Sequence, residues 1–324
     1  DAELTMFRNL TAFLVPLANV PAPADLAAAL AEHPLRDPGA LELATEGWVS
    51  PMPGRADESL TRTLGQHTLI ALGTCSRILP TQVVQEALAE KLDQLETQRG
   101  RRPGGKERQR IKDEVITDLM PRAFLKRGRT LAWLDHRDGL LVVDTASRKA
   151  AEAVVHRLRE ALGSFPATPL LAGMSARQEL TDWITGDGVG MPDQLTLGDE
   201  AELRDLRDEG AIVRCRRQDL AAEEVREHVN AGKQVVQLAI TYDRRLQCVL
   251  AEDLTVRKLR FEDVVTDQLG DVAGEDATAE LDARFALMTG ELGRLFAFLA
   301  ETFDCDHGTL KLDGGQGMPP GLAA

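Results

Sequence analysis

The hydrophobic pattern of this chain changes at Pro80, and that change limits the possible folds more than any other feature of the sequence. From there to Gly100 the apolar residues recur at spacings of three and four positions, which predicts a helix with one apolar face. A turn is expected at residues 103–105, and a second apolar stripe over residues 111–119 predicts a second helix. Residues 79–119 should therefore form a protruding helical hairpin.

Short strand and helix patterns flank this hairpin. Before it we expect strands at residues 7–16 and 68–72, a helix at 24–32 and a loop at 47–53. After it we expect strands at 131–135, 140–144, 212–218, 234–241, 246–250 and 255–261, with helices at 147–162, 179–183, 221–230 and 281–299. These elements predict an α+β fold, elongated and multi-lobed, with antiparallel sheets.

Pro166 and Pro169 mark a plausible boundary between two larger units. We therefore divide the chain into a central α/β region, a hairpin tip, an α+β base domain and a flexible tail rich in Gly and Pro. The central region comprises residues 1–78 and 120–165, the hairpin tip residues 79–119, the base domain residues 166–303 and the tail residues 304–324.

Positive charge is concentrated in one stretch of an acidic protein. The chain has a formal net charge of −14, yet residues 99–129 hold eleven Lys or Arg and only four Asp or Glu. An acidic molecule that gathers its cations in this way is expected to bind an acidic polymer. The hairpin tip contributes the candidate DNA contacts Arg99, Arg101, Arg102 and Lys106. Set against this, a run of charges is more often a solvated helix face.

A second basic set lies in the predicted strands of the base domain. In a strand, alternate residues share a face, so Arg214 lies with Arg216 and Lys258 with Arg260. Such rows suit contacts to phosphates rather than to base edges, because nothing in them reads a sequence. The four residues are therefore candidate contacts to duplex DNA.

The chemical motifs of enzymes are missing from the sequence. Residues 100–106 begin like a phosphate-binding loop, but a helix precedes them and Glu107 replaces the Ser or Thr that would bind magnesium. The four cysteines stand far apart, and no nucleophile motif or His pairing supports the scattered carboxylates. We therefore expect no enzyme activity, catalytic residue, metal or cofactor. We also expect no membrane segment and a cytoplasmic location.

An ordered set of short motifs along the chain resembles the RdgC family of bacterial recombination-associated proteins. The resemblance spans residues 6–303, and no single motif in it is specific. It rests on the segments at 47–49, 78–80, 112–115, 119–124, 217–220, 231–233 and 287–292. The family implies a horseshoe-like monomer and a cytoplasmic, nucleoid-associated homodimer with two-fold symmetry. It also implies that the dimer closes into a ring around duplex DNA without sequence preference, and so restrains RecA in homologous recombination.

The resemblance also assigns roles to individual residues. Arg122 and Phe124 match a dimer contact in which the Phe acts as a gate. Arg216, Arg217 and Gln218 match a Lys-Lys-Gln finger that contacts DNA, with Arg in place of both lysines. Lys233 matches a lysine that faces the hole of the ring. The overall charge favours a ring independently, because an acidic outer surface repels DNA while an enclosed basic surface holds it.

Two other functions compete with DNA encirclement. The first is a regulator that contacts RecA directly through its acidic surface, with the basic stretch as an incidental helix tip. The second is a metal-dependent nuclease built on carboxylate pairs such as Asp135 and Asp144. Pulling down RecA from nuclease-treated solution tests for the first function. Incubating duplex DNA with the protein and magnesium, and looking for nicks, tests for the second.

Overall fold

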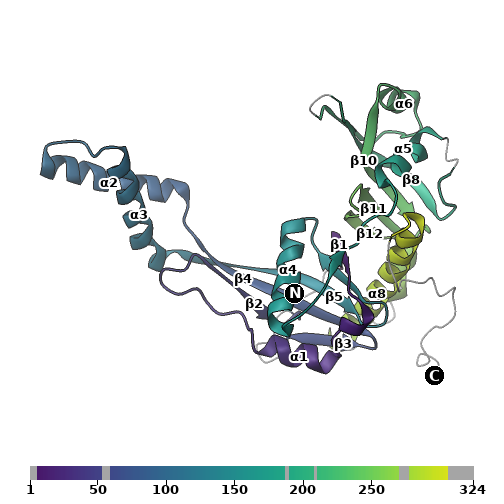
Figure 1. The fold of residues 1–324 in the computed structure, drawn as a ribbon, viewed down its shortest axis with the longest axis horizontal. Helices are drawn as coiled ribbons and strands as arrows, with labels where there is room; N and C mark the ends of the chain where they lie inside the picture. The colour runs from purple at the N-terminus through teal and green to yellow at the C-terminus, as the bar shows by residue number, and fades with distance from the viewer. Residues whose placement is uncertain (1–5, 53–58, 187–189, 208–209, 270–276, 306–324) are drawn as a thin grey trace.

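The computed structural model describes residues 6–52, 59–186, 190–207, 210–269 and 277–305. These residues form an α+β fold around one large, mainly antiparallel sheet of twelve strands. Ten of the strands form a continuous path in the order β2-β4-β5-β6-β1-β12-β11-β10-β8-β9. The remaining two, β3 and β7, pair with β4 and β1 respectively. Figure 1 shows the helical hairpin at one end of the molecule and the strands around β8 and β10 at the other.

The strands fall into two groups along the chain. The first group is β1 (Leu10–Leu14), β2 (Ala44–Val49), β3 (Thr61–Leu64), β4 (His67–Ile78), β5 (Phe124–Asp135), β6 (Leu140–Asp144) and β7 (Thr168–Pro169). The second group is β8 (Leu195–Asp205), β9 (Ile212–Arg216), β10 (Lys233–Tyr242), β11 (Leu246–Ala251) and β12 (Val256–Phe261). The two groups join where β1 pairs with β12.

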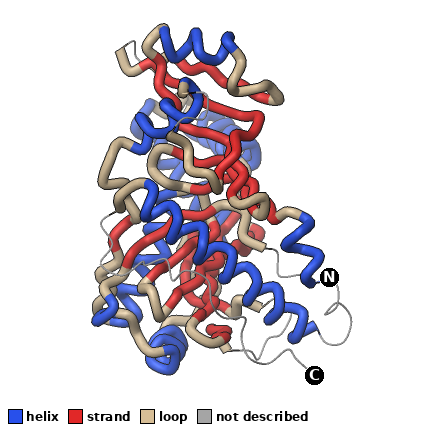
Figure 2. Tube along the Cα trace, turned by 90° about the vertical axis from the view of Figure 1, so that its right-hand side faces the viewer, coloured by secondary structure: helices blue, strands red, loops and turns tan. Residues whose placement is uncertain are grey.

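The helices pack against both faces of the sheet, as the side view in Figure 2 illustrates. The α-helices are α1 (Pro23–Ala31), α2 (Thr81–Arg99), α3 (Gly105–Leu119), α4 (Arg148–Leu162), α5 (Ala176–Thr185), α6 (Glu223–Asn230), α7 (Asp263–Thr266) and α8 (Ala277–Thr302). Single 3-10 turns occupy Leu17–Asn19, Met120–Arg122 and Asp267–Leu269. No helix in the described part of the chain is both long and apolar enough to cross a membrane.

Alternating side chains divide the core into two layers. Leu141 and Val143 of β6 face α1 and α4, whereas Leu140 and Val142 face α8. The α8 layer also contains the buried face of the second strand group, including Leu238 and its neighbours. Helix α8 therefore packs against strands from both ends of the chain, which holds the two strand groups in one body.

The hairpin is supported separately from this core. Helices α2 and α3 bury only a small apolar cluster of their own, centred on Leu88, Ile111 and Val115. Gly100 ends α2 with a φ of 66°, a left-handed conformation that glycine adopts readily. The predicted helical hairpin is confirmed, with α3 beginning at Gly105.

Most predicted elements are present, but their bounds differ in informative ways. Strand β5 begins at Phe124 rather than at residue 131, and its first six residues are exposed. Strand β8 was not predicted, because only part of it alternates between apolar and charged residues. The tail prediction at 304–324 falls mostly outside the described residues, although Cys305 is buried in the core. The boundaries assigned to the domains stay a prediction.

The prediction of a loop at residues 47–53 was wrong for its first half. Gly47, Trp48 and Val49 are the end of β2, and Trp48 is buried. Gly47 lies so close to the backbone of Leu35 that a Cβ atom would approach its Cα at 2.5 Å. A close approach of two chain segments therefore requires glycine at this position, which the sequence prediction assigned to a loop.

Candidate nucleic-acid interface

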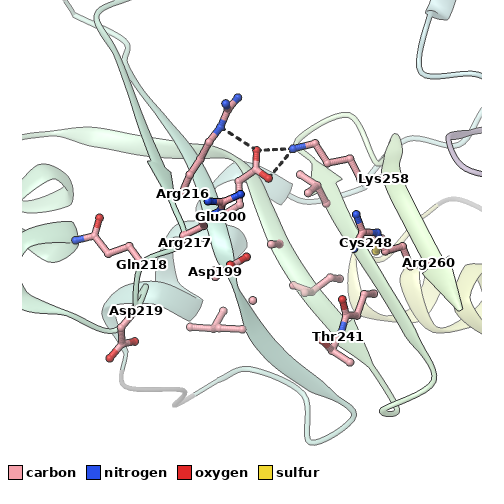
Figure 3. A pocket seen from close by; sticks show the side chains of 16 residues that line it. Asp199, Glu200, Arg216, Arg217, Gln218, Asp219, Thr241, Cys248, Lys258 and Arg260 are labelled. Atoms are coloured by element: carbon pink, nitrogen blue, oxygen red, sulfur yellow. Dashed lines mark hydrogen bonds and ion pairs between the residues drawn. The ribbon is translucent and has the colours of Figure 1, made fainter. Parts of the chain in front are cut away.

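A large trough lies among strands β8 to β12 (Figure 3). Its volume is about 970 Å³. Small or polar side chains form its floor, among them Gly198, Ala239, Thr241 and Gln247. Arg216, Arg217, Lys258 and Arg260 line it, together with Asp199, Glu200 and Asp219. The trough therefore combines four cations with three carboxylates and lacks an aromatic platform for stacking bases.

One wall of the trough is the β8–β9 hairpin. Residues Glu200 and Glu202 of β8 lie directly opposite Arg216 and Arg214 of β9 in the strand register. The guanidinium Nε of Arg214 lies 2.8 Å from Oε2 of Glu202, and that of Arg216 lies 3.5 Å from Oε1 of Glu200. These cross-strand ion pairs hold the two arginines upright on one face, as predicted from their alternation.

The other wall comes from β12. The register between β11 and β12 shifts between Gln247 and Val249, which creates a bulge at the level of Lys258. The Lys258 backbone has a φ of 52°, a left-handed conformation that is uncommon for a side-chain-bearing residue. As a result, Lys258 and Arg260 are both exposed while Leu259 between them is buried. The prediction that these two cations share a face is confirmed.

Two trough cations have no acidic partner among the described residues. Arg217, which follows β9 with a φ of 53°, and Arg260 form no ion pair with the residues that the structure describes. Strained backbone of this kind occurs often at functional sites, where the surrounding structure holds it. Gln218 beside Arg217 instead donates from its side-chain nitrogen to Glu224 over 2.8 Å. Arg217 and Arg260 are therefore the trough cations most available to an anion.

A second, smaller concavity continues the trough along the sheet. It has a volume of about 480 Å³ and adds Arg214, Arg257, Asn9 and Gln237 to the lining. The two concavities share Glu200, Arg216, Val249 and Lys258. Arg214, Arg216, Arg217, Gln218, Lys258 and Arg260 are thus brought together, whereas Lys233 at the start of β10 lines neither concavity.

The hairpin tip forms a separate basic surface, at the opposite end of the molecule (Figure 1). Arg99 and Arg101 both pair with Glu107, at 2.7 and 3.4 Å, and Arg102 pairs with Glu96 at 2.9 Å. Lys106 has no ion-pair partner among the described residues. The tip residues of the sequence prediction therefore lie together but apart from the trough.

An exposed apolar surface lies where β4 ends and β5 begins, next to the hairpin. Phe124 begins β5 and leaves 84% of its surface exposed, with Leu125 and Ile78 partly exposed beside it. A phenylalanine this exposed is costly in water, and it marks a contact surface more often than a defect. Arg122, the last residue of the 3-10 turn that precedes β5, is also exposed.

Sequence reasoning missed the acidic side of the trough. Glu200 and Glu202 alternate with the buried residues Ala201 and Leu203, a period of two that indicates a strand with one acidic face. This alternation can be found in the sequence, but the contact of Glu200 with Lys258 of β12 cannot. Within the described residues no group of three or more His, Cys, Asp or Glu side chains is arranged to hold a metal ion. Burial raises the pKa of Cys248, beneath the trough, to about 12, which keeps this thiol protonated at neutral pH.

Comparisons with known proteins agree with the resemblance described above. A family model described as "Putative exonuclease, RdgC" matches residues 5–305. A protein of Xylella fastidiosa (strain 9a5c) named Recombination-associated protein RdgC is 45% identical over 293 residues, which cover 90% of this chain and 96% of that protein. A protein with the same name in Stenotrophomonas maltophilia (strain R551-3) is 42% identical, over 92% of this chain and 97% of that protein. Another with this name, in Xanthomonas campestris pv. campestris (strain B100), is 43% identical, over 91% of this chain and 96% of that protein.

Proposed function

Since this chain belongs to the RdgC family of recombination-associated proteins, we propose that it binds duplex DNA without sequence preference and thereby restrains recombination. The observation that carries this proposal is the trough, in which cations from β9 and β12 line a floor with no aromatic residue. Cations of this kind neutralise phosphates, which every sequence presents alike. The binding would therefore depend on charge and shape and not on base identity.

The arrangement of the basic surfaces supports encirclement by a homodimer. The trough and the hairpin tip lie at opposite ends of an acidic molecule whose formal net charge is −14. A single molecule would present both surfaces to one duplex only by curving around it, as a horseshoe-like monomer does. A second copy that met the exposed Phe124 surface would close the path into a ring with two-fold symmetry.

In this proposal, the protein restrains RecA because it occupies the duplex DNA. A closed ring that surrounds the duplex denies that duplex to the strand-exchange machinery without touching RecA. It would associate with the nucleoid for the same reason. Direct contact with RecA through the acidic surface is the competing explanation, and it predicts capture of RecA after all DNA has been digested.

The proposed role requires no catalysis, whereas the description of the matching family model reads "Putative exonuclease, RdgC". The two are separated by incubating end-labelled linear duplex and nicked circles with the protein and Mg²⁺ or Mn²⁺. Shortening of the labelled strand would contradict a purely binding role.

Binding to duplex DNA across a range of salt concentrations tests the proposal, with the mass of the free protein measured in parallel. If several phosphates are neutralised, the logarithm of the affinity should fall linearly with the logarithm of salt, by roughly 0.9 per contact. Duplexes of unrelated sequence should give the same line. An affinity that does not depend on salt, or a monomeric mass at every concentration, would overturn the proposal.

A further inference from the structure

The trough is too small to receive a whole duplex, so only part of the DNA can enter it. Together the two connected concavities have the form of a channel that runs along the sheet, with volumes of about 970 and 480 Å³. Cations line both of its sides, and small, polar and aliphatic side chains line the rest. A channel of this shape and charge suits the sugar–phosphate backbone of one DNA strand, with the bases turned outward.

The centre of this channel already holds an anion of the protein itself. Lys258 donates from Nζ to both carboxylate oxygens of Glu200, at 2.6 and 2.7 Å. Arg216 approaches Oε1 of the same carboxylate from the opposite wall, with its Nε at 3.5 Å. Figure 3 shows the Arg216 and Lys258 side chains pointing toward Glu200 from different strands. The carboxylate thus lies where a phosphate with two free oxygens would meet the same donors.

We propose that Glu200 is an internal competitor that occupies a phosphate position in the channel, and that a DNA strand displaces it on binding. This inference rests on the proposed DNA-binding function. Arg217 and Arg260, which have no acidic partner in the described structure, attract the strand first. The Glu200 side chain then turns away, and a phosphate takes over its contacts with Arg216 and Lys258.

The exposure of these three side chains makes such an exchange feasible. Glu200 is 27% exposed, Lys258 57% and Arg216 66%. Ion pairs with this much access to water contribute little net stability, so breaking them costs little. A DNA phosphate brings the same charge and two free acceptor oxygens, as the carboxylate does, and its arrival also releases condensed counterions from the DNA. The competitor therefore lowers the affinity without preventing binding.

The simplest alternative is that Glu200 only stabilises the β8–β9 hairpin through its cross-strand pair with Arg216. In that case its removal would lower stability and either leave DNA binding unchanged or weaken it, because Arg216 would lose its support. The variant Glu200→Gln separates the two ideas, since it keeps the shape of the side chain and removes only the charge. Glu46→Gln is the matched control: Glu46 of β2 pairs with Arg157 of α4, outside the channel, and its loss changes the net charge equally.

The experiment measures binding of the full chain to a blunt duplex of random sequence at several salt concentrations. Glu200→Gln should bind about two- to fivefold more tightly than the unmodified protein, as expected for the loss of one exposed competing charge. Glu46→Gln should change the affinity much less, because a distant charge is screened at physiological salt. In the background of Lys258→Ala, the gain from Glu200→Gln should shrink, because the main donor to the carboxylate has gone.

Three outcomes would overturn the proposal. One is equal tightening by Glu200→Gln and Glu46→Gln, which would assign the effect to net charge. Another is unchanged or weaker binding by a folded Glu200→Gln protein, which would make Glu200 only a support for the β8–β9 hairpin and its cations. The third is a gain that persists fully without Lys258. Failure of the unmodified protein to bind duplex at any salt concentration would instead overturn the proposed function itself. That case is distinct, because the three outcomes above all require measurable binding by the unmodified protein.

Discussion

Leu10 of β1 lies directly opposite Val256 of β12, and both side chains are completely buried. This pair joins the strands of the central region to those of the base, so the sheet continues through the whole described body. Nearby, the amide of Leu259 donates to the carbonyl of Arg8 over 2.8 Å. The joint therefore combines apolar packing with backbone hydrogen bonds from both ends of the chain.

Truncation at this joint should weaken the whole molecule. We expect Leu10→Ala to lower the free energy of unfolding by about 3 kcal/mol, because it leaves a cavity where no water can enter. Urea titration followed by tryptophan fluorescence measures this, since Trp133 lies in the central strands and Trp183 in α5. A loss below about 1 kcal/mol would mean that the joint repacks. Separate transitions for the two ends would mean that they fold independently.

The ion pair between Arg245 and Glu291 should make stability depend on acid pH. Glu291 of α8 is only 2% exposed, and Arg245 donates to it from Nε over 2.9 Å while Arg294 donates from the same helix. Burial alone would raise the pKa of Glu291, but these guanidinium groups together lower it below its usual value. Because the folded pKa is depressed, the stabilisation is present above the unfolded pKa and is lost as pH falls through the folded one.

The variant Glu291→Gln checks this dependence. It should be clearly less stable than the unmodified protein at pH 7, by about 2 kcal/mol, because the buried end of the pair loses its charge. The difference should shrink below about pH 4, the range in which unperturbed glutamates become protonated. Urea titrations at neutral and acid pH measure both. A difference that stays constant on acidification would show that Glu291 stabilises α8 by packing alone.

The sequence predicts the hairpin well and the trough only in part, and the reason is the range of the interactions. The α2 stripe and Gly100 act within a few residues, so their pattern is visible locally. The meeting of Glu200 with Lys258 depends instead on two strands separated by β10 and β11, and on a bulge beside Lys258. Spacing along the chain contains no signal for such a contact, because sheet curvature and bulges decide it.

The sequence pattern also fails to predict a strand whose residues are all exposed. The first half of β5, from Phe124 to Arg129, has no buried residue, so its strand conformation comes from pairing with β4. The resemblance to the RdgC family singled out Arg216, Arg217 and Phe124; in the structure the two arginines line the trough and Phe124 is exposed. Their roles in DNA binding and dimer contact stay predictions.

Removing the two arginines at the end of β9 should weaken binding to all duplexes alike. We expect Arg216→Ala with Arg217→Ala to make the salt dependence shallower by about two contacts, because each side chain neutralises about one phosphate. The control removes two exposed arginines from α4, Arg148 and Arg159, which lie outside the channel. Fluorescence anisotropy on several unrelated duplexes provides the measurement. A loss confined to one sequence would indicate base recognition, and equal losses in the control would indicate a general charge effect.

Phe124 should matter for assembly and not for folding. Its side chain is 84% exposed, so Phe124→Ser removes almost no packing within the monomer and should change the free energy of unfolding by less than about 0.5 kcal/mol. If a second copy covers this surface, the same change should shift the protein from dimer toward monomer in sedimentation equilibrium. Val264→Ser is a suitable control, because Val264 is also a large exposed apolar residue but lies on α7, away from β5.

Closed circular DNA makes the test specific for a ring. A closed dimer leaves a linear duplex by sliding off its ends but leaves a circle only when an interface opens. Phe124→Ser should therefore shorten the residence time on circles strongly while changing that on short linear duplexes little. Linearising a circle with bound protein should release the unmodified dimer faster than before the cut. If residence on circles and linear DNA is equal for both proteins, the protein binds the outside of the duplex, and the Phe124 surface serves another contact.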